Sequence, residues 1–146
     1  MSDTPKTFQL NFDGYWPEPI ISGLPAASGI YCVFSCTHNS QDNTVALKKL
    51  LYIGESADVR GRVDGHPGWD TWKRALTSGQ VICLSAATIS PEADRERAEA
   101  AMIFKHQPPS NTSLKDSFAQ DTTTIKSSGK TNLLTSSFTV SKGATR

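Results

Sequence analysis

Two tripeptides that contain tyrosine stand at the start and the end of a pair of strand-like segments. GIY occupies residues 29–31 in SGIYCVFSC, and YIG occupies residues 52–54 in LLYIGES. Side chains alternate between the faces of adjacent antiparallel strands, so Tyr31 and Tyr52 are predicted to project from one face of a hairpin and the isoleucines beside them from the other. Two phenols would then meet at a surface, beside glycines that leave room for a ligand. Taken alone, the pair is more typical of aromatic residues in a half-buried sheet.

Four further polar residues follow at spacings that could complete a site. Arg62 stands ten positions after the second tyrosine, and His66 stands one helical turn beyond it. Glu99 lies in an alanine-rich segment, and Asn111 follows the break QPP. Each has a simple structural interpretation: solvated helix residues for the first two, an ion pair with Arg95 for Glu99, and a turn for Asn111. Their combination, rather than any one of them, indicates chemistry.

Three strand-like segments and three helical segments would position these residues. Strands are expected through GIYCVFSC, VALKKLLYIG and QVICLSAATI, which are rich in β-branched and other apolar residues. Ser56 or Asp58 would cap a short helix, a second would run over residues 69–76, and Ser90-Pro91 would open a longer one. The order strand, strand, helix, helix, strand, helix predicts an α+β fold: a small three-stranded antiparallel β-sheet flanked by helices.

Composition divides the chain into one domain and two flanking segments. We expect residues 1–18 to form an extended N-terminal lead-in with several prolines, and residues 19–118 to form the domain. Residues 119–146 are expected to be a flexible C-terminal tail rich in Ser, Thr and Lys. With 146 residues and a hydrophobic content of 37%, the chain can bury one ordinary core.

Composition also bounds location and partners. No apolar run approaches the roughly 18 residues of a membrane span, and the N-terminus lacks the pattern of a signal peptide. We therefore expect a cytoplasmic protein with no membrane partner. A formal net charge of +1 lacks the basic excess of many nucleic-acid binders, so such a function would depend on local patches. Basic residues form two clusters in the sequence: Arg60, Arg62, Lys73 and Arg74, and then Arg95, Arg97 and Lys105.

The cysteines and two of the tryptophans each have two interpretations. All three cysteines lie in apolar segments, where buried thiols are the ordinary expectation: Cys32, Cys36 and Cys83. A metal site at the first two with His38 lacks a fourth ligand at useful spacing. Trp69 and Trp72 would share one helix face, which favours core packing over the alternative of a partner-docking surface.

From residue 29 to about residue 111, the chain resembles the GIY-YIG nuclease superfamily, as a small stand-alone member. The motifs that carry the resemblance are GIY, YIG, DVRGRV with Arg62, and AEAAMIFKHQPPSN with Glu99 and Asn111. Two features depart from the family pattern. The insert over residues 32–51 is longer than the family's usual short hairpin, and Glu55 follows YIG where many members have a basic or small residue.

The resemblance implies a metal-dependent DNA endonuclease, which hydrolyses phosphodiester bonds by a one-metal mechanism. Glu99 would ligate Mg²⁺, with Mn²⁺ as a substitute, and Arg62 would bind the phosphate. Tyr31 or Tyr52 would orient or deprotonate the attacking water, and His66 is the easier proton acceptor on intrinsic grounds. The general base thus stays open among these three residues.

The remaining expectations concern binding and partners. Asn111 would act as a sixth catalytic-site residue by holding local geometry near Glu99. Substrate contacts are expected from Arg60, Arg62, Lys73 and Lys105, with DNA as the partner and a homodimer or a partner protein for targeting as further expectations. The alternative function is a catalytically silent nucleic-acid-binding or protein-interaction module on the same fold.

Overall fold

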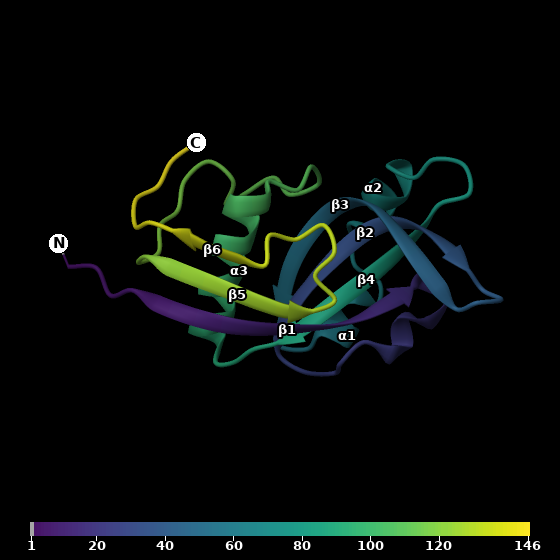
Figure 1. The fold of residues 1–146 in the computed structure, drawn as a ribbon, viewed down its shortest axis with the longest axis horizontal. Helices are drawn as coiled ribbons and strands as arrows, with labels where there is room; N and C mark the ends of the chain where they lie inside the picture. The colour runs from purple at the N-terminus through teal and green to yellow at the C-terminus, as the bar shows by residue number, and fades with distance from the viewer. Residues whose placement is uncertain (1) are drawn as a thin grey trace.

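The computed structural model describes residues 2–146, and its centre is one curled, mixed sheet of six strands (Figure 1). The strands are β1 (Lys6–Pro17), β2 (Gly29–Asn39), β3 (Thr44–Ser56), β4 (Val81–Thr88), β5 (Thr123–Gly129) and β6 (Ser137–Val140). The helices are the 3-10 helix η1 (Glu18–Gly23) and the α-helices α1 (Val59–Val63), α2 (Trp69–Arg74) and α3 (Glu92–His106). Across the sheet the order is β3-β2-β4-β1-β5-β6. All neighbours are antiparallel except β1 and β5, which run parallel.

The prediction of a small three-stranded sheet flanked by helices is wrong. The three expected strands are present as β2, β3 and β4, but β1 lies in the segment expected to be a lead-in, and β5 and β6 lie in the segment expected to be a flexible tail. The physical reason is that these segments contain few apolar residues, but the apolar residues alternate with polar ones, a pattern that overall composition does not reveal. Phe8, Leu10 and Phe12 alternate with polar residues along β1, and Ile125 and Phe138 do the same on the added strands, so each strand buries one face.

Alternate residues of β2 face two separate cores. Ile30 and Cys32 pack in a core that includes the apolar face of α3. Tyr31 and Val33 pack in a second core with residues of α1 and α2, including the fully buried Trp72. The tyrosine of GIY therefore faces the two short helices, while the isoleucine beside it faces the long one.

The three predicted helices are present, with a difference in length for the first. α1 begins after Asp58, whose carboxylate accepts a hydrogen bond from the Gly61 N–H. It ends at Val63, so His66 lies in the turn beyond the helix rather than on its next turn. α3 ends at His106, and the next residue, Gln107, adopts a left-handed conformation with φ 51° before the two prolines.

Side chains expected in the core are found there. All three cysteines are free and buried, as the apolar segments predict. Trp72 is buried, and Trp69 is half-buried with its ring centroid 5.1 Å from that of Trp72. Both tryptophans therefore contribute to packing, as the shared helix face predicts.

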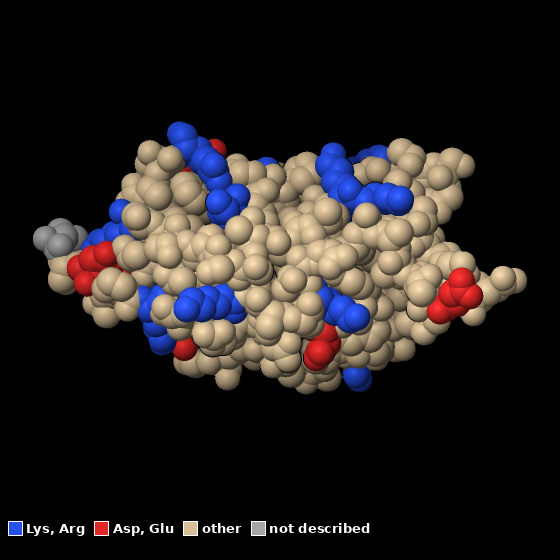
Figure 2. Space-filling view, viewed as in Figure 1, with Lys and Arg blue, Asp and Glu red and all other residues tan. Residues whose placement is uncertain are grey.

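Charged side chains are spread over the surface viewed in Figure 1. Figure 2 shows Lys and Arg there in several separate groups, with Asp and Glu between them and uncharged residues over most of the area. This distribution fits the formal net charge of +1. None of the helices described for residues 2–146 has the length and apolar character that crossing a membrane would need.

Candidate active site

The two tyrosines lie side by side on one face of the β2–β3 hairpin. Tyr31 pairs with Gly54 across the strands, and Tyr52 pairs with Val33. The ring centroids of the tyrosines are 6.3 Å apart. Tyr31 is buried, whereas Tyr52 is half-buried and so keeps one side open to solvent. The alternation along the two strands thus brings the phenols together as the sequence predicts.

Gly54 is required by the phenol that lies over it. A Cβ at this position would stand 2.4 Å from the Cζ and Oη atoms of Tyr31. The Tyr31 ring is rigid and buried, so it could not yield without leaving its place beside Tyr52. The glycine of YIG therefore sets where the phenol of GIY can lie.

His66 joins this pair through the turn that follows α1. Its Nδ1 atom accepts a hydrogen bond from the Gly68 N–H at 2.8 Å. Its ring centroid is 4.7 Å from that of Trp72 with an interplanar angle of 30°, and it makes edge contacts with Tyr31 at 6.2 Å and Tyr52 at 5.6 Å. Burial lowers the pKa of His66 to about 4, and the charge of Arg62 acts in the same direction. The imidazole is thus neutral at physiological pH.

The two phenols also have perturbed proton affinities. Burial raises the pKa of Tyr31, the neighbouring Tyr52 adds to the rise, and the Arg62 guanidinium opposes it. Burial raises the pKa of Tyr52 as well, and the Glu99 carboxylate adds to this effect. These influences place the phenols, the guanidinium and the carboxylate within one electrostatic neighbourhood, although they come from β2, β3, α1 and α3.

At Glu99, burial and neighbouring negative charges outweigh the one cation that acts on the carboxyl group. Burial raises its pKa to about 8, and the negative charges of Glu55 and then Glu96 contribute to the rise, against a smaller opposing effect of Arg95. A hard divalent cation prefers carboxylate oxygen, and its charge would relieve this repulsion. The donor chemistry at Glu99 therefore fits such an ion. Within residues 2–146, no group of three or more His, Cys, Asp or Glu side chains is placed to hold a metal ion. Protein ligation would therefore rest on this one carboxylate.

Asn111 uses its whole side-chain amide on the backbone of β3. Its Oδ1 atom accepts the Ile53 N–H at 3.0 Å, and its Nδ2 donates to the Ile53 carbonyl at 2.9 Å. The Ser110 N–H donates to the Leu51 carbonyl at 2.9 Å. The loop after α3 thus pairs with the outer edge of β3 on both sides of Tyr52.

Arg95 and Glu55 form a buried ion pair that the sequence interpretation missed. Arg95 Nε lies 3.1 Å from Glu55 Oε1, and Arg95 Nη1 donates to Ser28 Oγ at 3.0 Å. The guanidinium therefore ties α3 to the residue before GIY and to the residue after YIG. The ion-pair partners of Arg95 are Glu55 and, at 3.6 Å, Glu92 rather than Glu99, which corrects the simple interpretation of Glu99 as its i+4 partner. The signal was the unusual acid after YIG, because a half-buried carboxylate needs a basic partner.

The expected substrate-binding residues do not all lie together. Arg62 is exposed beside the phenols. Arg60 donates from Nε to the Leu24 carbonyl at 2.7 Å, and Lys73 pairs with Glu18 at 2.9 Å, so both already have partners. Lys105 lies beside β6, at the opposite edge of the sheet from β3.

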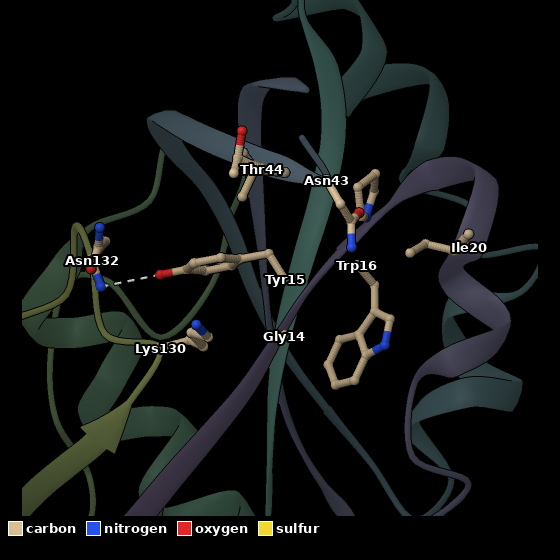
Figure 3. Close-up of a pocket in the computed structure, with 10 residues that line it drawn as sticks. Gly14, Tyr15, Trp16, Ile20, Asn43, Thr44, Lys130 and Asn132 are labelled. Atoms are coloured by element: carbon tan, nitrogen blue, oxygen red, sulfur yellow. Dashed lines mark hydrogen bonds between the residues drawn. The ribbon is translucent and has the colours of Figure 1, made fainter. Parts of the chain in front are cut away.

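A separate cavity of about 470 Å³ lies where β1, the tip of the β2–β3 hairpin and the turn after β5 meet (Figure 3). None of the predicted site residues lines it. Figure 3 shows the Tyr15 ring pointing toward Asn132, whose N–H donates to Tyr15 Oη at 3.2 Å, while the Trp16 side chain points the other way. The cavity is therefore formed by the long hairpin insert, by β1 and by the turn after β5, and it is distinct from the site of the paired phenols.

Comparisons with known proteins give one distant likeness. No family model matches the chain, and no solved structure matches it. UvrABC system protein C from two strains of Halobacterium salinarum is 28% identical to the chain over 95 residues. This likeness covers 65% of the chain but only 16% of the relative, so the chain spans a small part of that protein's length.

Proposed function

We propose that the chain is a GIY-YIG-type endonuclease that hydrolyses phosphodiester bonds in DNA. The observation that carries the proposal is the meeting of two phenols, one imidazole and one guanidinium beside a carboxylate whose pKa is raised to about 8. These groups come from separate elements, and several are in states that cost stability, which is typical of functional sites. The distant likeness to UvrABC system protein C is consistent with this assignment.

Arg62 would bind the phosphate that is attacked. Its guanidinium is exposed on α1, and its charge acts on both phenols. A planar fork of N–H donors matches two oxygens of a phosphate, and its charge offsets the negative charge that develops during hydrolysis. Arg62 would thus hold the scissile phosphate against the tyrosine pair.

Glu99 would hold one divalent cation, Mg²⁺ or Mn²⁺ in its place. When bound, the ion would supply positive charge to the scissile phosphate and to the departing oxygen. Without a cation, burial and the charge of Glu55 favour the protonated carboxyl. Glu99 would therefore ionise fully as the site becomes loaded.

Tyr52 would contact the attacking water, because it is half-buried while Tyr31 is buried beneath it. The pKa of each phenol is raised, so both keep their protons at neutral pH and orient the water by hydrogen bonding. The Arg62 charge favours ionisation of both phenols. Deprotonation of the water by either phenol would depend on that charge, and Asn111 would act as a positioning residue by fixing the backbone beside Tyr52.

The test is cleavage of labelled single-stranded, duplex and branched DNA in Mg²⁺, in Mn²⁺ and in EDTA. Glu99→Gln is compared with Glu96→Gln, which removes the same charge from an exposed position on the same helix. Metal-dependent cutting that is lost only in Glu99→Gln supports the proposal. Binding of DNA without cutting by the folded wild type in either metal would instead favour a silent binding module.

A further inference from the structure

The hydrogen bond at Nδ1 fixes which nitrogen of His66 carries the proton. Gly68 donates its backbone N–H to Nδ1 at 2.8 Å, so Nδ1 must present a lone pair. In a neutral imidazole the proton then resides on Nε2, which becomes a donor. His66 is therefore in the Nε2–H form before any substrate binds.

This donor is buried and has no partner. His66 is only 7% exposed, and its Nε2 atom is one of four buried side-chain atoms in residues 2–146 that make no hydrogen bond. Of the four, it alone belongs to the predicted catalytic set. Buried polar groups are nearly always hydrogen-bonded. A buried N–H donor without a partner, beside the two phenols, therefore indicates that a ligand supplies the acceptor.

Packing holds the donor in one direction. The ring is stacked 4.7 Å from Trp72, and a Cβ at Gly68 would lie 2.9 Å from the Trp72 ring and 3.0 Å from His66 Nδ1. Only glycine lets the backbone N–H approach the imidazole this closely. The turn, the tryptophan and the imidazole thus form one preorganised unit.

The groups around His66 also select the class of acceptor. Tyr31 and Tyr52 contribute phenol O–H groups, and Arg62 contributes guanidinium N–H groups. A ligand facing these donors and the Nε2–H must accept several hydrogen bonds and carry negative charge. A phosphodiester oxygen meets both requirements.

We propose that His66 is a hydrogen-bond donor, through Nε2–H, to a non-bridging oxygen of the substrate phosphate, and that it is not the general base. This inference rests on the proposed function, because it names the role of one residue in that same site. The sequence interpretation, in which His66 is the easier proton acceptor, considers only intrinsic proton affinity. With Nδ1 held by Gly68 and Nε2 already protonated, the ring has no free lone pair for a proton from water.

The first test is long-range ¹H–¹⁵N NMR of the whole, substrate-free protein. His106 is an internal control, because its Nε2 accepts the Thr135 N–H at 2.9 Å and its Nδ1 faces the Met102 carbonyl at 2.8 Å, which requires the opposite tautomer. We expect Nε2–H for His66 and Nδ1–H for His106 at pH 7. An Nδ1–H or doubly protonated His66 would overturn the proposal whether or not the protein cuts DNA.

The second test uses short single-stranded and duplex DNA in EDTA, which separates binding from cutting. The Nε2–H resonance of His66 should shift on addition of DNA, and inorganic phosphate serves as the small-anion probe. A shift with DNA in a protein that cuts nothing would retain the donor role and count against the endonuclease. No shift with DNA that demonstrably binds would overturn the donor role.

Two variants separate a donor from a base. His66→Gln keeps an N–H near the position of Nε2, whereas His66→Phe keeps a ring against Trp72 and removes the donor. We expect His66→Phe to weaken DNA binding and cleavage by on the order of 10- to 100-fold, and His66→Gln to restore most of this loss with an unchanged pH profile. Circular dichroism checks folding. Loss of activity in His66→Gln together with loss of a rate inflection near the pKa of His66, which is lowered to about 4, would show a base instead.

Discussion

His66 and His106 lie toward opposite edges of the sheet and use their ring nitrogens differently. His106 packs beside β6, and both of its nitrogens have partners, the Met102 carbonyl and the Thr135 N–H. His66 packs beside β2 and β3, and only Nδ1 has a partner. Burial lowers the pKa of both imidazoles. Burial alone therefore does not separate these two histidines, whereas an unmet hydrogen bond beside the paired phenols does.

The charged groups of the two regions show the same contrast. Near β5 and β6, Arg97 donates hydrogen bonds to Thr123 Oγ1 and to the Thr122 carbonyl, each at 2.8 Å. Lys142 forms an ion pair with Asp121 at 3.3 Å in the same region. Beside the phenols, the like charges of Glu55 and Glu96 act on Glu99 more strongly than the opposite charge of Arg95. Near β5 and β6 the charged side chains are paired within the protein and stabilise the fold. Beside the phenols, His66 Nε2 lacks a hydrogen-bond partner and Glu99 is not neutralised, so both can interact with a ligand.

The largest effect is expected at Glu99. Glu99→Gln should reduce cleavage by more than about 100-fold, because loss of a residue that only supports a metal ligand already costs 10- to 100-fold. Added Mg²⁺ should raise the Tm of the wild type but not of the variant. An unchanged cleavage rate in Glu99→Gln would contradict the contrast between the two regions.

The same variant has a defined pH dependence of stability. The Glu99 carboxyl holds its proton up to about pH 8 in the folded state but releases it near 4.5 in the unfolded chain. The unfolded state therefore binds fewer protons between these values, and the wild type loses stability relative to Glu99→Gln as the pH rises through this interval. Urea unfolding at a series of pH values without metal measures the difference.

The next largest effect is expected at the buried ion pair. Arg95→Met leaves the Glu55 carboxylate half-buried without its cation and should lower the free energy of unfolding by about 3 kcal/mol. The double variant Arg95→Met/Glu55→Gln should recover much of this loss, because it removes the unpaired charge as well. Urea unfolding of the single and double variants forms the cycle, and strictly additive losses would show that the pair is not coupled.

A smaller effect, confined to stability, is expected at His106. His106→Phe removes two hydrogen bonds near β6 and should lower the free energy of unfolding by about 1–2 kcal/mol, with DNA cleavage unchanged. Paired with His66→Phe, it separates the two histidines in one assay. A cleavage loss in His106→Phe equal to that in His66→Phe would erase the distinction between the two regions.

The smallest effect on stability is expected at the exposed surface beside β5 and β6. Lys142→Met breaks the ion pair with Asp121, in which both side chains are about one-third exposed. Such pairs contribute less than about 1 kcal/mol, and solvent and salt screen them. Thermal unfolding at low and high salt should show a small difference that salt removes. A decrease in the free energy of unfolding of more than about 2 kcal/mol would show that the Lys142–Asp121 pair contributes more than an exposed ion pair usually does.

The site was more predictable from the sequence than the sheet was. The sequence singles out the tyrosines of GIY and YIG together with Arg62 and Glu99. In the fold the two phenols lie side by side, and the charges of Arg62 and Glu99 act on them. The prediction underestimated the sheet because β1 and β5 pair between residues 117 positions apart, such as Lys6 with Thr123. The alternation of Phe8, Leu10 and Phe12 indicates β1, although the prolines that follow favour an extended lead-in.

The sequence by itself determined local geometry: two-residue alternation placed Tyr31 and Tyr52 on one face, and the carboxylate of Asp58 began α1. Tertiary structure decided the state of each functional group. Tyr31 and Tyr52 pack against His66 from other strands, Glu55 is the distant ion-pair partner of Arg95, and the raised pKa of Glu99 comes from burial. Periodicity and caps act over a few residues, whereas desolvation and hydrogen-bond partners depend on elements distant in the chain, so only the folded arrangement could fix them.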